Sequence, residues 1–190
     1  MLFYAIQAFY HADKQIDIIV ALPSQYMDTW RQLCSKYKFH LRYSLVEGGS
    51  NRFYSVKNAL NSITGAGIVA IHDGVRPLIS KSLILKSYSE AAKYGNAVPC
   101  IEVKDSVRIL SENGNSAIKR EILRGIQTPQ CFDIQLIKSA YQQDFSDNFT
   151  DDATVLENTG ARIHLFKGSR KNIKITWPED LKIAAQLLSN

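Results

Sequence analysis

The sequence has no long apolar run, since none approaches the roughly 20 residues that a membrane-spanning helix needs. Its opening residues, Met-Leu-Phe-Tyr-Ala-Ile, also lack the basic region with which a signal peptide begins. We therefore expect a cytoplasmic protein without a membrane partner.

Cysteine and histidine are also sparse. The three cysteines, Cys34, Cys100 and Cys131, are odd in number, far apart and without CxxC spacing, which argues against a disulfide framework and a structural zinc site. The four histidines show no ligand spacing. No Gly-x-Ser-x-Gly segment marks a nucleophilic serine. We expect neither a metal site built on these residues nor covalent catalysis by serine or cysteine.

A dense lysine and arginine run with interleaved aromatic residues, typical of nucleic-acid surfaces, is absent as well. The chain still carries 23 basic and 18 acidic residues, a formal net charge of +5. A small phosphorylated ligand accounts for this excess, so we expect no nucleic-acid partner. With 190 residues, of which 45% are hydrophobic, the chain can form a substantial core, and we assign residues 1–190 to a single domain.

Helical and extended patterns alternate along the first half of the chain. The expected helices cover residues 2–10, 25–36, 52–63 and 81–94, and the expected strands cover residues 16–22, 41–46, 68–72 and 96–101. This alternation predicts an α/β fold with a mostly parallel, doubly wound sheet flanked by helices. Further on we expect helices at 134–141, from Thr150 and from Pro178, and extended segments at 162–166 and 172–176.

The pattern changes in residues 103–126. Residues 103–109 alternate apolar and polar side chains, Asn113-Gly114-Asn115 forms a turn, and residues 117–126 are again extended in character. These features predict a protruding β-arm. Because an isolated two-stranded hairpin is marginally stable in water, we expect the arm to pack against a second copy of the chain and form a homodimer.

The apolar run Ile68-Val69-Ala70-Ile71 leads directly into His72-Asp73-Gly74-Val75-Arg76-Pro77. A short apolar run is typical of a buried parallel strand, and ligands of open α/β sheets bind beyond the carboxyl ends of such strands. A carboxylate next to a guanidinium suits a metal-bound phosphate ligand. A strand-ending turn with a surface ion pair explains the same residues equally well.

Two further segments have both a structural and a functional interpretation. Residues 48–55, Gly-Gly-Ser-Asn-Arg-Phe-Tyr-Ser, allow close backbone approach to an anion or a base edge, although a glycine turn with helix capping is the simpler explanation. In Thr150-Asp151-Asp152-Ala153, Thr150 can cap a helix and both aspartates suit its dipole. The same segment can hold a substrate phosphate, with either aspartate approaching a metal.

Three basic residues also allow two explanations. Lys174 alternates with Ile173 and Ile175, while Arg120 and Arg124 lie on the expected arm. For each of them, solvated charge is the alternative to ligand binding.

Together these segments resemble the 2-C-methyl-D-erythritol 4-phosphate cytidylyltransferase family of the non-mevalonate isoprenoid pathway. The resemblance runs along the whole chain and rests on five motifs in a fixed order. They are Gly48-Gly49-x-x-Arg52-x-x-Ser55-Val56, His72-Asp73-Gly74-Val75-Arg76-Pro77, Gln127-Thr128-Pro129-Gln130, Thr150-Asp151-Asp152-Ala153 and Asn172-Ile173-Lys174-Ile175-Thr176-x-Pro178-Glu179-Asp180-Leu181.

The resemblance implies a Rossmann-like nucleotidyltransferase that joins CTP to 2-C-methyl-D-erythritol 4-phosphate and releases pyrophosphate with the help of Mg²⁺. A phosphate oxygen of the sugar-alcohol phosphate attacks the α-phosphorus of CTP in line. Such chemistry depends on positioning and charge neutralisation, and needs little covalent participation by the protein.

The resemblance also implies residue roles. The nucleotide would be bound by Gly49, Ser50, Ser55, Asp73 and Gly74, with the first three at the cytosine and Asp73 near the ribose and the metal. Arg76 supports the same pocket, and the residues expected to be catalytic are Asp73, Arg76 and Lys174. The methylerythritol phosphate would be bound by Arg120, Thr150 and Lys174, with Arg120 contributed by the partner subunit.

The sequence departs from the family pattern in one respect. Members of the family begin with a strand and a glycine-rich loop of the form A-A-G-x-G-x-R, followed by a lysine in a P-K-Q segment, and these groups clamp the triphosphate. Neither segment occurs here. We therefore expect an N-terminally truncated chain, and because losing one such stabilising donor typically costs about 10²–10³ in rate, we expect little catalysis.

Two alternatives remain at this stage. Ribitol 5-phosphate cytidylyltransferases share overlapping motifs, although Thr150-Asp151-Asp152-Ala153 and Asp105-Ser106-Val107 fit the first family better. The other alternative is a non-catalytic dimeric remnant that has lost its nucleotide chemistry.

Overall fold

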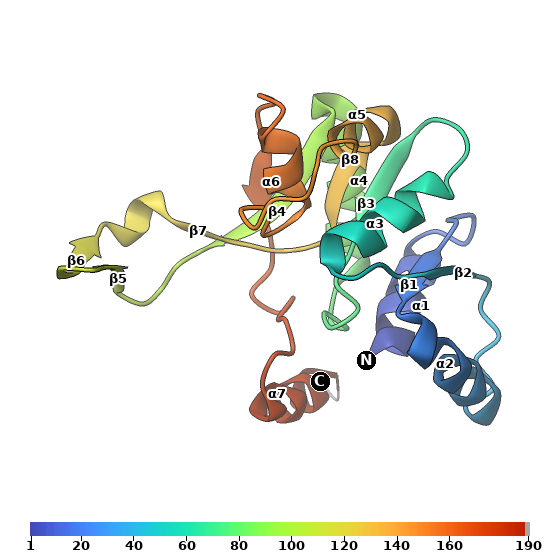
Figure 1. The fold of residues 1–190 in the computed structure, drawn as a ribbon. Coiled ribbons are helices and arrows are strands. Elements are labelled where there is room, and N and C mark those ends of the chain that lie inside the picture. Colours follow the sequence, from blue (N-terminus) through green and yellow to red (C-terminus); the bar gives the residue numbers. More distant parts are fainter. Residues whose placement is uncertain (189–190) are drawn as a thin grey trace.

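The computed structural model describes residues 1–188 as helices packed around β-sheets, with one hairpin that projects outward (Figure 1). The helices are α1 (Leu2–Ala12), α2 (Ser24–Lys36), α3 (Arg52–Asn61), α4 (Lys81–Tyr94), η1 (Arg120–Ile122), α5 (Ile134–Ala140), α6 (Asp152–Glu157) and α7 (Pro178–Leu188). The strands are β1 (Ile19–Leu22), β2 (Ser44–Glu47), β3 (Ile68–Ile71), β4 (Asn96–Glu102), β5 (Val107–Ser111), β6 (Gly114–Ile118), β7 (Arg124–Ile126), β8 (Gln130–Asp133) and β9 (Leu165–Lys167). The predicted α/β class is confirmed.

The strands of the main body form two sheets. β1 and β2 pair in parallel, and the larger sheet has the order β3-β8-β4-β7, with β9 also paired to β4. β9 runs parallel to β4, whereas β8 is antiparallel to both β3 and β4, and β7 is antiparallel to β4. The expectation of a mostly parallel sheet therefore needs correction for β7 and β8. The reason is that the chain leaves β4, runs out into the hairpin and returns in the opposite direction.

Alternation along β3 and β8 builds a core on both faces of the larger sheet. Ile68 and Ala70 pack with Cys131 in a cluster that includes α1 and α4. Val69 and Ile71 pack with Phe132 in a cluster that includes α3, α5 and α6. Successive strand residues point to opposite faces, so this short stretch needs apolar side chains at every position.

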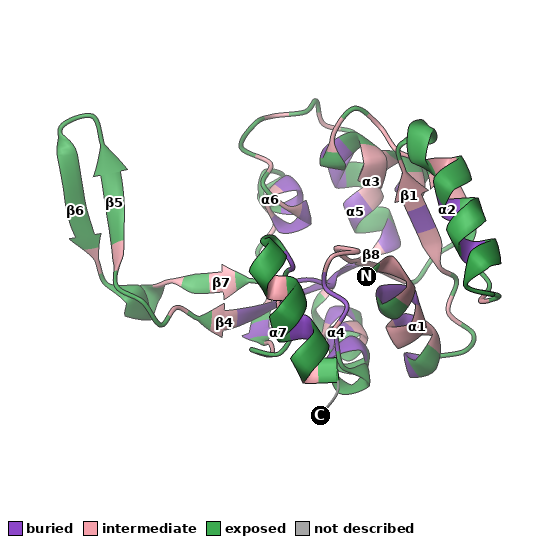
Figure 2. Ribbon diagram, turned by 90° about the horizontal axis from the view of Figure 1, so that it is seen from below, coloured by how far each residue is buried: buried purple, intermediate pink, exposed green. Residues whose placement is uncertain are grey.

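The hairpin formed by β5 and β6 has almost no core of its own. Its strands pair from Val107–Ile118 to Ser111–Gly114, and nearly all of its residues are exposed (Figure 2). In both Figure 1 and Figure 2 it lies away from the helices that cover the main sheet. We refer to residues 103–126, which include η1 and β7, as the arm.

Two other expectations can be compared with the structure. Residues 172–176, expected to be extended, form no regular strand, although Ile175 N–H donates to the carbonyl of Val75 at 2.9 Å. Within residues 1–188, no helix has the length and apolar character needed to cross a membrane.

The packing of α4 generates a stability prediction. Ile84 is 1% exposed and its neighbour Leu85 is 45% exposed. We expect Ile84→Ala to lower the free energy of unfolding by about 2–5 kcal/mol, because it leaves a cavity under the sheet. Leu85→Ala, the matched control, should change it by less than about 0.5 kcal/mol. Urea denaturation measures both, and equal losses would contradict the observed helix orientation.

Candidate active site

A groove of about 830 Å³ lies between β1 and β3 and is lined by these strands together with α1 and α3. Most of its wall is apolar, but polar and charged groups gather where β3 ends. These groups are Arg52, Ser55, His72, Asp73 and Lys174. The location agrees with the rule that ligands of α/β sheets bind beyond strand carboxyl ends.

The turn before α3 is held by its own hydrogen bonds. Gly49 N–H donates to Ser55 Oγ at 3.0 Å, and Ser55 Oγ–H donates to the Asn51 carbonyl at 2.8 Å. Asn51 caps the helix, since its side chain accepts from Tyr54 N–H. A Cβ on Gly49 would overlap with the Tyr54 side chain and come within 2.9 Å of the Tyr54 carbonyl carbon, so only glycine fits there.

The predicted nucleotide residues of this turn do not all face the groove. Ser55 lines it, together with Asp73 and Gly74, whereas Gly49 and Ser50 are not among its lining residues. Contact between a cytosine and residues 49–50 stays a prediction.

Asp73 is the centre of the charged end of the groove. Its side chain is 13% exposed and faces three cations. Oδ2 lies 3.3 Å from Lys174 Nζ and 3.5 Å from Arg76 Nε, and Oδ1 lies 3.7 Å from Arg52 Nε. Burial raises the pKa of Asp73, but Lys174, Arg52 and Arg76 outweigh burial and leave the pKa below its usual value. The acid is therefore a carboxylate at neutral pH.

Arg76 fixes the loop after β3 to two distant segments. Its side chain is 10% exposed, and Nη1 donates to the Asn172 carbonyl at 2.8 Å while Nη2 lies 3.5 Å from the Ile126 carbonyl. The Arg76–Asp73 pair is thus no surface ion pair. This arrangement favours the site interpretation of the segment over the turn alternative.

A chain of hydrogen bonds fixes the position of the Asp73 backbone N–H and the protonation state of His72. His72 Nε2 lies 3.1 Å from the Arg76 carbonyl, which only accepts, so Nε2 carries the proton. His72 Nδ1 then accepts from Thr128 Oγ–H at 3.0 Å, and Thr128 Oγ accepts from Asp73 N–H at 3.1 Å. A neutral imidazole satisfies every donor and acceptor in this chain. Burial lowers the pKa of His72 to about 4.

The start of α6 corrects the predicted role of its first residues. The helix cap is Asp151, not Thr150: Asp151 accepts from Thr154 N–H at 2.8 Å, and Thr154 Oγ1 accepts from Asp151 N–H. Both Thr150 and Asp151 are residue types that cap helices, and only the structure shows where the first helical turn begins. Thr150 lies just before the cap and is exposed.

The second aspartate has a role that the sequence interpretation missed. Asp152 is fully buried, accepts two hydrogen bonds from Arg52 and accepts a third from the Tyr141 hydroxyl. Arg52 and Asp152 occur in two of the quoted motifs, but nothing in the sequence indicates that residues 100 positions apart are paired. Since Asp151 serves as a cap and Asp152 binds Arg52, neither is available as a metal ligand.

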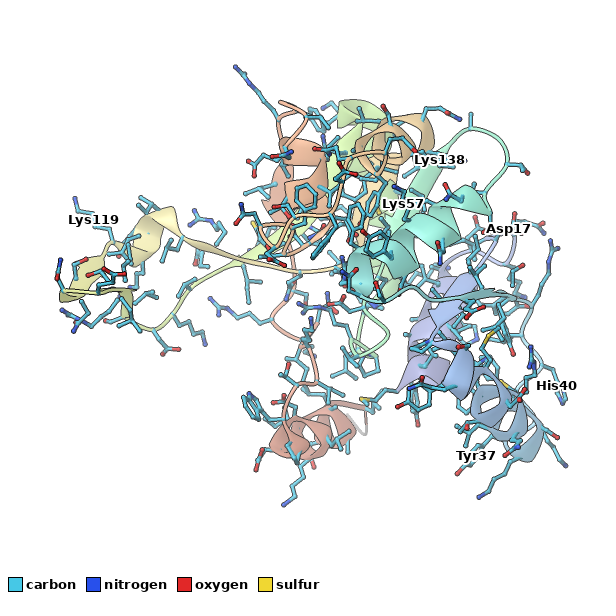
Figure 3. All side chains as sticks on the ribbon, in the orientation of Figure 1. Asp17, Tyr37, His40, Lys57, Lys119 and Lys138 are labelled. Atoms are coloured by element: carbon cyan, nitrogen blue, oxygen red, sulfur yellow. The ribbon has the colours of Figure 1, made fainter. Side chains whose placement is uncertain are left out.

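Lys174 and Arg120 differ in their distance from the groove. Lys174 is half-exposed and contacts Asp73, so the structure brings these two predicted site residues together. Arg120 belongs to η1 on the arm, where Nη1 donates to the Lys104 carbonyl at 2.6 Å. Figure 3 places the preceding residue, Lys119, on the arm and away from the main body. Within one chain, Arg120 is not part of the Asp73 cluster.

A divalent cation would have few protein ligands here. Among residues 1–188, no three His, Cys, Asp or Glu side chains group as a metal site. Mg²⁺ commonly binds through one or two carboxylates and completes its shell with water and substrate phosphates. The single carboxylate of Asp73 fits that pattern.

The lowered pKa of His72 generates a pH prediction. The unfolded chain binds a proton on this residue near pH 6.5, and the folded chain only near pH 4. The unfolded state therefore binds more protons between these values, and stability is complete above pH 6.5 and falls as the pH drops toward 4. We expect this residue alone to contribute a loss of up to about 3 kcal/mol. Urea denaturation across this range, with His72→Gln as control, measures the effect. A His72 ring signal in NMR that titrates near pH 6.5 would contradict it.

Comparisons with known proteins agree on one family. The sequence model of the 2-C-methyl-D-erythritol 4-phosphate cytidylyltransferase family matches residues 1–190. Proteins of that name from Bacteroides fragilis and Phocaeicola vulgatus are 43% and 44% identical to this chain over 188 residues, covering 99% of this chain and 86% of each relative.

Solved structures give the same result. The 4-diphosphocytidyl-2C-methyl-D-erythritol synthase of Anaerococcus prevotii is similar with a TM-score of 0.86 at 26% identity, covering 100% of this chain and 86% of that one. The 2-C-methyl-D-erythritol 4-phosphate cytidylyltransferase of Thermus thermophilus has a TM-score of 0.80 at 27% identity, with 97% and 89% covered. The chain therefore belongs to the 2-C-methyl-D-erythritol 4-phosphate cytidylyltransferase family.

Proposed function

We propose that this chain transfers a cytidylyl group from CTP to 2-C-methyl-D-erythritol 4-phosphate, giving CDP-methylerythritol and pyrophosphate. The observation that carries the proposal is the Asp73 carboxylate, which lies among Arg52, Arg76 and Lys174 at the end of a groove of about 830 Å³. Grooves of roughly 300–1,000 Å³ are the usual size for small-molecule and cofactor sites.

The cluster suits phosphoryl chemistry. As a phosphate oxygen of the acceptor attacks the α-phosphorus, the bond to the β-phosphate breaks and pyrophosphate leaves with the electron pair. The protein has to position both reactants and neutralise their charge. Lys174 is half-exposed, so its ammonium group is able to turn from Asp73 to a phosphate oxygen.

Asp73 is the residue that would hold Mg²⁺, together with oxygen atoms of the nucleotide phosphates. The ion's contribution would be charge neutralisation at those oxygens. Arg76 would keep Asp73 in place, because its guanidinium is fixed by the Asn172 carbonyl. We also propose a cytoplasmic location, since both reactants are soluble phosphorylated metabolites.

We further propose a homodimer in which the arm of each chain reaches the groove of the other. The arm exposes several large apolar side chains, and Arg120 lies on it rather than beside Asp73. The exposed apolar residues are Ile109, Leu110, Ile122 and Ile126. Such side chains on a segment without its own core are typical of an interface, and a second chain would bring Arg120 toward an acceptor phosphate.

The direct test of the activity is pyrophosphate release with CTP and Mg²⁺. We expect release with 2-C-methyl-D-erythritol 4-phosphate, at a low rate because the glycine-rich loop and the lysine of the P-K-Q segment do not occur in this chain, and at most a trace with ribitol 5-phosphate. A preference for ribitol phosphate would contradict the proposed acceptor. Nucleotide binding without release in either reaction would instead support the non-catalytic alternative.

If Arg120 of each chain acts in the groove of its partner, mixing two inactive variants should restore activity. Arg120→Ala and Lys174→Ala should each abolish most of the activity when assayed alone. In a mixed dimer, one site combines an intact Lys174 with the partner's intact Arg120, so subunit exchange should restore about a quarter of the wild-type rate. The control is a mixture of each variant with itself. No recovery after exchange, verified with differently tagged chains, would show that Arg120 does not act in the partner's site.

A further inference from the structure

Arg52 is bound end-on by a buried acid. Its Nη1 donates to Asp152 Oδ1 at 2.9 Å and its Nη2 donates to Asp152 Oδ2 at 2.6 Å. Asp152 is fully buried, and the Tyr141 hydroxyl donates to its Oδ1 at 2.6 Å. Burial lowers the pKa of Arg52, but Asp152 and Asp73 outweigh burial and raise it. The guanidinium is therefore a fixed positive charge.

Asp152 is itself held rigidly. The preceding residue, Asp151, caps α6 and accepts from Gln130 Nε2 at 2.7 Å. The following residue, Ala153, donates its N–H to Gln130 Oε1 at 2.8 Å. Gln130 is 1% exposed and belongs to β8, so the position of Asp152 is set by the sheet.

This arrangement limits how Arg52 contacts Asp73. Each Nη atom donates one hydrogen bond to Asp152, and the Arg52 atom paired with Asp73 is Nε, 3.7 Å from Oδ1. The other two cations, Arg76 and Lys174, contact Oδ2 instead. The cation paired with Oδ1 is therefore farther away than either cation paired with Oδ2. Asp73 also lines the groove.

We propose that Asp152 is a positioning residue, which holds the Arg52 guanidinium away from Asp73 and so keeps Asp73 Oδ1 open to the ligand of the site. The identity of that ligand, a metal–nucleotide complex, rests on the function proposed above. Without Asp152, the freed Nη atoms would rotate onto Oδ1, because a guanidinium and a carboxylate form a strong bidentate pair.

Stability alone is a weak explanation for this ion pair, in which Asp152 is fully buried and the Arg52 side chain is 40% exposed. Withdrawing a carboxylate from water is costly, and apolar replacements of buried charges are often neutral or stabilising. Control of the neighbouring Asp73 carboxylate gives the Arg52–Asp152 pair a function in ligand binding. The Tyr141 hydroxyl supports this role, since it donates to Asp152 Oδ1, the same oxygen that accepts from Arg52 Nη1.

The first test is a crystal structure of Asp152→Asn. We expect the Arg52 guanidinium to move toward Asp73, with a nitrogen within about 3.2 Å of Oδ1. Asp133→Asn is the matched control, because Asp133 caps α5 by accepting from Leu136 N–H and does not line the groove, while asparagine caps helices equally well. A guanidinium that stays in its present position in Asp152→Asn would overturn the proposal.

The second test is calorimetric titration with Mg²⁺ and CTP in the absence of acceptor. We expect Asp152→Asn to weaken nucleotide binding at least about tenfold, the equivalent of 1.4 kcal/mol. The double variant Asp152→Asn/Arg52→Met should restore most of that loss, because it removes the competing guanidinium. Asp133→Asn should bind like the wild type. A double variant that binds no better than Asp152→Asn would overturn the proposal, since a purely structural role predicts no rescue.

The two proposals fail in different ways. A wild-type chain that binds Mg²⁺ and CTP but releases no pyrophosphate contradicts the proposed reaction and leaves both tests of Asp152 in force. If Asp152→Asn does not fold, Tyr141→Phe takes its place, since it removes only the hydroxyl that donates to Asp152. It should shift Arg52 and nucleotide affinity in the same direction by a smaller factor, and an unchanged Arg52 position would overturn the proposal.

Discussion

The arrangement of this fold depends on one carboxylate, Asp73, which is placed at the end of a buried strand and surrounded by cations. An isolated carboxylate in a side chain only 13% exposed would be costly, because burial disfavours its charged form. Three cations from different segments offset that cost. Each cation in turn has to be held in place, and much of the surrounding hydrogen bonding does so.

The segments that hold these cations come from the whole length of the chain. Arg76 is fixed by the Asn172 carbonyl, and the Asn172 side chain donates to the Thr128 carbonyl. Thr128 also binds the Asp73 backbone and His72. The loop after β3, the segment before β8 and the segment near Lys174 therefore form one connected unit, so we expect a change in the His72 charge to affect folding.

Part of this arrangement is visible in the sequence and part is not. The apolar run before His72 is a local signal for a buried strand, so the position of Asp73 at a strand end was predictable. Lys174 is predicted as a site residue from its place in the last of the five motifs, where it alternates with Ile173 and Ile175. The Arg52–Asp152 pair joins positions 100 residues apart, and no local pattern reports such a pairing. Strand direction is equally invisible to periodicity, and no strand is expected at residues 130–133, so β8 and its antiparallel pairing are apparent only in the structure.

The charges of the cluster indicate what the groove is built to receive. Arg52, Arg76 and Lys174 face Asp73, and Asp152 neutralises one of them, so three positive and two negative side chains leave a net positive charge. Asp152 is fully buried and Arg76 nearly so, whereas Lys174 is half-exposed. The uncompensated charge therefore lies on the side of the groove that solvent reaches. In a site of reduced dielectric, such a charge attracts a phosphate more strongly than it would in water. The buried pairs keep the geometry fixed, and the exposed lysine supplies the charge that a phosphorylated ligand neutralises.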